Sequence, residues 1–97
     1  MPRARRVSRY LAECYWPGVT VPGVAQTVQR VQRAAETLTV EGSDIRYVSA
    51  FVVPEDEIAF CLFDARSRKV VEEACRRADL PCDRILLVAQ IPSEQAR

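Results

Sequence analysis

The sequence predicts a single α+β domain with a ferredoxin-like fold, and two observations lead to this prediction. Four segments are rich in alternating, β-branched and aromatic residues, as strands are, and two others carry apolar stripes at helical spacing. Their order along the chain is strand, helix, two strands, helix, strand, which is the split βαβ arrangement. Right-handed crossovers then give a four-stranded antiparallel sheet in the order 4-1-3-2, with both helices on one face.

The first strand and the first helix lie in the N-terminal half. Residues 8–14 alternate between two faces: Tyr10, Ala12 and Cys14 on one, and Arg9, Leu11 and Glu13 on the other. Pro17 and Gly18 break this strand, because proline removes a ladder donor and glycine permits turn geometry. The helix is expected over residues 22–40, where apolar side chains recur at steps of four and three: Val24, Val28, Val31, Ala35 and Leu38. Gly42 suits a left-handed cap at its end.

Two strands, a helix and a last strand follow. Strands are expected over residues 45–53 and 57–65, joined by a hairpin at Pro54-Glu55-Asp56. Ser67 is the expected N-cap of a second helix that reaches about Ala78. The inner face of this helix is expected to hold Val70, Val71, Ala74, Cys75 and Ala78. Residues 83–91 supply the last strand.

The second and third strands are apolar on both faces. In the second strand one face is expected to hold Tyr47, Phe51 and Val53, and the other Val48, Ala50 and Val52. In the third, Ile58, Phe60 and Leu62 alternate with Ala59, Cys61 and Phe63. The strands of an antiparallel sheet with one solvent-exposed face would alternate between apolar and polar residues. The two helices can cover only one face. We therefore expect a second copy of the chain to cover the other face, as a homodimer that encloses a cleft.

Composition and charge narrow the range of possible partners and locations. The chain has 97 residues and a net charge of +1, which suits one domain and argues against nucleic acid as the main partner. Residues 1–7 are interpreted as a flexible basic arm, 8–91 as the domain and 92–97 as a frayed tail. No apolar run approaches the roughly 20 residues that span a bilayer, so no membrane partner is expected. No secretory signal follows the N-terminal arginines, and a cytoplasmic location is the default expectation.

A metal or ligand site is expected where the first strand ends, beside the hairpin and the turn before the last strand. The first and last strands are neighbours, so Cys14 and Cys82 are predicted to approach each other, and reduced thiols are expected. The candidate metal ligands are therefore Cys14, Cys82 and Asp56, for a divalent metal, although a proline-flanked acidic turn is more often solvated. Tyr15, Trp16 and Glu57 are candidate ligand-binding residues; the two aromatic residues could equally cap the core.

Catalysis would have to proceed without imidazole, since the chain has no histidine. This excludes His-based triads and two-His metal motifs. The candidate catalytic residues are Glu13, Asp64, Tyr10 and Tyr47, because a carboxyl in an apolar cleft can have the raised pKa of a general acid. The alternative is that the two acids pair with arginines such as Arg9 or Arg84 and serve the fold.

Several segments resemble a known family. They are Arg9-Tyr10-Leu11-Ala12-Glu13, Pro54-Glu55-Asp56-Glu57 followed by Phe60-Cys61-Leu62-Phe63-Asp64-Ala65, and Arg77-Ala78-Asp79-Leu80-Pro81 before Asp83-Arg84-Ile85. Over roughly residues 10–88 they are similar to a family of small ferredoxin-like proteins, common in actinobacteria, that includes a nickel-binding member. The resemblance implies a homodimer and a nickel site. Nickel ligands are not carried over, because imidazole is expected in such sites and this chain has none.

Three functions remain open at this stage. The first is a non-enzymatic dimeric binding module for a small ligand or metal. The second is a small dimeric enzyme, of isomerase or cyclase type, that uses a carboxyl or tyrosine in an apolar cleft. The third is a purely structural interaction domain. A buried carboxyl facing a closed apolar pocket would favour the enzyme.

Overall fold

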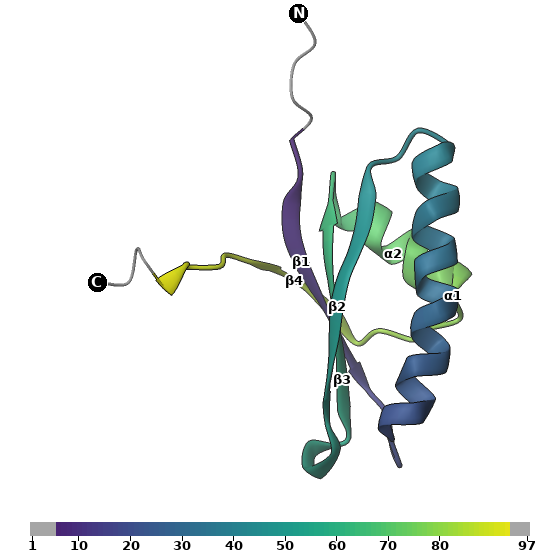
Figure 1. The fold of residues 1–97 in the computed structure, drawn as a ribbon, viewed down its shortest axis with the longest axis vertical. Helices are drawn as coiled ribbons and strands as arrows, with labels where there is room; N and C mark the ends of the chain where they lie inside the picture. The colour runs from purple at the N-terminus through teal and green to yellow at the C-terminus, as the bar shows by residue number, and fades with distance from the viewer. Residues whose placement is uncertain (1–5, 94–97) are drawn as a thin grey trace, which may run out of the picture.

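The computed structural model describes residues 6–93 and has the predicted ferredoxin-like fold. Its elements are β1 (Ser8–Tyr15), α1 (Val21–Val40), β2 (Ile45–Val53), the single 3-10 turn η1 (Pro54–Asp56), β3 (Ile58–Ala65), α2 (Arg68–Arg77) and β4 (Arg84–Val88). The strands form one antiparallel sheet in the order β2-β3-β1-β4, which is the predicted order read from the other edge. Figure 1 shows α1 and α2 on the same side of this sheet.

Local signals in the sequence set the helix ends. The Thr20 hydroxyl accepts a hydrogen bond from the Gly23 amide at the start of α1, and the Ser67 hydroxyl caps α2 at the Val70 amide. After α1 the chain turns at Gly42, whose φ of +104° is open to glycine and strained for other residues. The expected last strand over residues 83–91 is too long. The strand β4 runs only from Arg84 to Val88, and Val88 opposite Arg9 is the last pair of its ladder with β1.

The core lies between the sheet and the helices. Phe63, Val31 and Val71 are its largest fully buried side chains. Five other buried residues on this covered face of the sheet are small. They are Ala12, Cys14, Ala59, Cys61 and Ala65. Larger residues, among them Tyr10 and Tyr47, pack against this core while partly exposed.

The predicted faces of β2 were partly wrong. Tyr47 pairs with Phe63, but the next pair is Ser49 with Leu62, so Val48 is an extra residue in the ladder. Such an insertion changes the face on which the following residues point. Tyr47 consequently lies on the covered face with Ala50 and Val52, and not with Phe51 and Val53.

The terminal predictions fall largely outside the described residues. Of the expected arm over residues 1–7, Arg6 and Val7 are described and both are exposed. Of the expected tail over residues 92–97, Pro92 and Ser93 are described and exposed. Neither α1 nor α2 is long and apolar enough to cross a membrane, and no other helix of the described residues is.

Candidate functional site

Three segments meet at the end of β1, as the topology predicted. The Trp16 amide donates to the Glu57 carbonyl at 2.7 Å, which ties the β1 end to the start of β3. On the other side, the Asp83 amide donates to the Glu13 carbonyl at 2.8 Å, and the Asp83 carboxylate accepts from the Tyr15 amide. We call this region the thiol end of the sheet, because three of the four cysteines lie there.

The thiol end brings Cys14 and Cys82 into contact. Cys14 on β1 donates to Cys82, with 3.2 Å between the two sulfurs. Cys75 on α2 is close enough to Cys82 for each thiol to shift the pKa of the other. The hydrogen bonds from Cys14 and Cys75 lower the pKa of Cys82 to about 4, against the opposing effects of burial and of Asp83. The same contacts, together with burial, raise the pKa values of Cys14 and Cys75. All four cysteines are free thiols.

The predicted metal set does not assemble. Asp56 lies exposed in η1, beyond the last paired residues of β2 and β3, and has no recorded contact with either thiol. Within residues 6–93, no group of three or more histidine, cysteine, aspartate or glutamate side chains is arranged to hold a metal ion. Cys14 and Cys82 are thus a thiol pair rather than two corners of a complete metal site.

A pocket of about 290 Å³ opens beside the thiol pair. Its walls include Tyr15, Trp16 and Cys14, together with Pro17, Thr27, Arg30, Asp79, Leu80 and Pro81. Glu57, the third predicted ligand-binding residue, does not line it. The Glu57 carboxylate accepts from the Gly18 amide at 2.8 Å and so holds the turn after β1.

Arg30 is a pocket residue that the sequence reasoning missed. Its guanidinium donates to the Ala78 carbonyl at 3.0 Å, so it ties α1 to the end of α2 on the wall of the pocket. In the sequence Arg30 falls off the apolar stripe of α1, and nothing in the periodicity separates it from a solvated arginine.

Both candidate carboxylates are paired with arginines. Asp64 accepts from Arg9 at 2.8 and 3.0 Å and from Arg46 at 2.7 Å. These bonds, the one from Arg9 first, lower the pKa of Asp64 although burial opposes them. Glu13 accepts from Arg84 at 2.9 Å. The paired, structural state is therefore the one that the structure shows.

The candidate tyrosines lie on the covered side of the sheet. The Tyr47 ring packs edge-on against Phe63, with 6.2 Å between centroids, and burial raises its pKa. Tyr10 is half-buried and packs against the main core.

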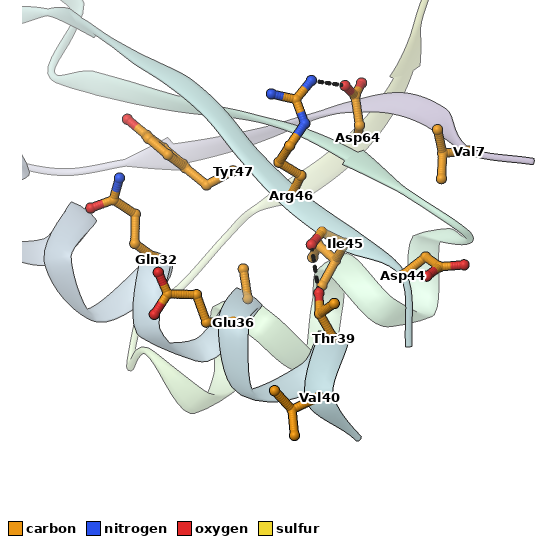
Figure 2. A pocket seen from close by; sticks show the side chains of 11 residues that line it. Val7, Gln32, Glu36, Thr39, Val40, Asp44, Ile45, Arg46, Tyr47 and Asp64 are labelled. Carbon is orange, nitrogen blue, oxygen red and sulfur yellow. Dashed lines mark hydrogen bonds and ion pairs between the residues drawn. The ribbon is translucent and has the colours of Figure 1, made fainter. Parts of the chain in front are cut away.

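A second, wider groove of about 800 Å³ runs between α1 and β2, and Figure 2 shows its lining. Tyr47 and Asp64 both line it, so the structure brings these two predicted residues to one groove. Figure 2 shows the Asp64 carboxylate bonded to Arg46 and the Thr39 hydroxyl bonded to the Ile45 carbonyl, with Glu36 on the α1 side of the groove.

The fold and the thiol end define a small ferredoxin-like protein without a complete single-chain metal centre in its described residues. The family described as "Nickel responsive protein SCO4226-like" matches the chain over residues 10–88, and the chain belongs to this family. The crystal structure of SCO4226 from Streptomyces coelicolor A3(2) is similar to it, with a TM-score of 0.70 and 19% sequence identity. The match covers 88% of this chain and all of that one, and it confirms the fold. No curated protein matches.

Proposed function

We propose that this chain is a non-enzymatic binding module that works as a homodimer, paired through the sheet face that the helices leave open. The observation that carries the proposal is the composition of that face, which we call the open face. Its cross-strand neighbours are bulky and apolar at the centre of the sheet. They are Leu86, Leu11 and Leu62 in one row, Phe60 and Phe51 in the next, and Ile58 and Val53 beyond.

The charges on the open face favour a second copy of the chain over a charged partner. They form two ion-paired clusters: Arg9, Arg46 and Asp64 at one end of the face, and Glu13 and Arg84 in the row of Phe60 and Phe51. Because each carboxylate already has an arginine, covering the face would not bury an unpaired acid. The net charge of +1 adds little repulsion between two identical chains.

The size of the open face also suits self-association. Four strands about 4.8 Å apart and about 26 Å long give roughly 500 Å² of flat sheet per copy. Two copies would thus bury on the order of 1,000 Å², the lower bound for a specific interface. A two-fold axis would place the same rows of residues against each other, as in most homodimers.

The family description raises nickel as the ligand, and the residues were tested for their fit to it. The chain has no histidine, and residues 6–93 hold no set of three ligands placed around one point. The described residues of one chain therefore do not fit a nickel site. The place we propose for a small ligand is the pocket lined by Tyr15 and Trp16, where an apolar wall meets the Arg30 guanidinium.

The pairing of the acids supports the non-enzymatic reading. A general acid at neutral pH needs a raised pKa, whereas the arginines hold the pKa of Asp64 below its usual range. Glu13 is engaged by Arg84 at the other end of β1. An enzyme that used either carboxylate would first have to break these bonds.

Native mass spectrometry of protein purified without added metal tests the proposal. We expect a mass of about twice the 11.0 kDa of one chain, together with any small ligand that stays bound. A monomer mass at micromolar concentration would contradict the dimer. A stoichiometric nickel ion retained by the untreated protein would contradict the fit test.

A further inference from the structure

Cys14 and Cys82 meet at the end of the sheet, with Cys75 nearby on α2, and neither the fold nor the proposed dimer requires their meeting. Cys14 comes from β1, Cys75 from α2 and Cys82 from the connection before β4. The sulfurs of Cys14 and Cys82 are 3.2 Å apart although 68 positions separate them in the sequence. They would have to approach by about 1.1 Å to reach the ~2.05 Å of a disulfide bond.

The three thiols differ in their access to solvent. Cys14 is 1% exposed and Cys75 is 3% exposed, whereas Cys82 is half-buried. Cys82 also lies on a connection outside helix and strand, between Ala78 and Arg84, and its thiol contacts the Leu80 carbonyl at 3.6 Å. A reagent from solvent would therefore meet Cys82 first, with Cys14 behind it.

The hydrogen bonds favour a negative charge on one sulfur. Cys14 and Cys75 both donate to Cys82, while Asp83 beside it disfavours the charge. The thiolate, and not the thiol, is the nucleophile in cysteine chemistry. An accessible thiolate with a buried thiol in contact is the arrangement of a cysteine that reacts and a cysteine that resolves the product.

We propose that Cys82 and Cys14 form a redox-active thiol pair whose substrate is a hydroperoxide. The Cys82 thiolate attacks the terminal peroxide oxygen, the O–O bond breaks, and the alkoxide leaves and takes a proton from water. Cys82 is then a sulfenic acid. The Cys14 sulfur attacks it, the S–O bond breaks, and the hydroxide leaves as water with the proton of the Cys14 thiol. Two thiols are oxidised by two electrons, and one hydroperoxide is reduced to an alcohol and water.

The pocket beside the pair gives room for the reagent. Cys14, Leu80 and Pro81 line its 290 Å³, so the pocket reaches one thiol of the pair and the two residues that precede Cys82. Oxidation would link the connection before β4 to β1. This thiol reaction goes beyond the proposed binding role. It needs neither a second copy nor a bound ligand, and so it can fail or hold independently of that role.

Mass spectrometry of the full, reduced chain tests the pair. One equivalent of hydrogen peroxide should remove two hydrogens per chain and give one peptide cross-link, Cys14 to Cys82, at a rate per chain that does not change with protein concentration. A dithiol should reverse it. Cys61→Ser is the matched control and should leave this cross-link in place.

Two variants separate the roles. Cys14→Ser should stop the reaction at Cys82 sulfenic acid, trapped as a 1,3-dione adduct, and Cys82→Ser should abolish both adduct and cross-link. If circular dichroism shows that Cys14→Ser does not fold, Cys14→Ala takes its place in the same experiment. A Cys75–Cys82 cross-link, linkage between chains, or an unreacted Cys82 would overturn the proposal.

Discussion

The two faces of the sheet differ in what covers them. The covered face mixes small buried residues with larger ones, of which Phe63 is fully buried. The open face carries leucines and phenylalanines, of which Phe51 is 51% exposed. Large apolar side chains thus lie on both faces, although the helices cover only one of them. The helices complete a core on that face, and the apolar residues of the open face are the basis of the proposed dimer.

Replacing the large side chain of the covered face should have the largest effect on stability. Phe63→Ala is expected to lower the free energy of unfolding by about 3–5 kcal/mol, because Phe63 is 0% exposed and its loss leaves a cavity. Urea denaturation measures this. Phe60→Ala on the open face is the matched variant, and its smaller cost should depend on protein concentration. If both variants lost the same free energy of unfolding at every protein concentration, the proposed difference between the two faces would be contradicted.

A charge at the centre of the open face should break the dimer. Leu11→Asp places a carboxylate between Leu62 and Leu86, and we expect association to weaken by at least about a hundredfold, because a buried unpaired charge costs several kcal/mol. Sedimentation velocity measures the effect. Leu87→Asp is the control, since Leu87 is 63% exposed and belongs to the other face of β4. A dimer that survives Leu11→Asp would not be formed by the open face.

The ion pairs at the edge of the open face should contribute less. Asp64→Asn is expected to cost about 1–2 kcal/mol at neutral pH, the scale of hydrogen bonds to a charged group. The folded pKa of Asp64 is lowered, so its contribution is full above the unfolded value of about 3.9 and is lost as pH falls through the folded value. The wild type should therefore lose stability below about pH 4 more steeply than the variant.

NMR titration of the carboxyl carbons checks the same point directly. Asp64 should titrate below the range of an exposed aspartate. An Asp64 that is still protonated near pH 6 would contradict the paired state and would favour an acid–base catalyst.

Nickel should have the smallest effect, because neither face offers a ligand set among the described residues. Calorimetry at neutral pH is expected to show no submicromolar transition with nickel. If one appears and Cys14→Ser abolishes it, the thiol end is a metal site after all.

The elements and the meeting of Cys14 with Cys82 could be predicted because both follow from chain-level rules. Apolar periodicity marks each helix and strand, and crossover handedness makes β1 and β4 neighbours. The face of Tyr47 could not be predicted, since one extra residue at Val48 reverses the alternation without altering the composition.

Side-chain contacts between elements that are far apart in the sequence could not be predicted either. Arg46 joins Asp64 because of the register between β2 and β3, which no local pattern encodes. Cys75 reaches Cys82 through the packing of α2 on the sheet. Such contacts depend on the distances between elements and not on their residues alone.

Association of the wild-type chain tests the central claim most directly. Sedimentation equilibrium from nanomolar to high micromolar concentration should give a reversible change from one to two chains, and the urea midpoint should fall on dilution. Both results follow if the open face is buried in the native state. A monomer throughout, with a urea midpoint that does not change on dilution, would contradict the account.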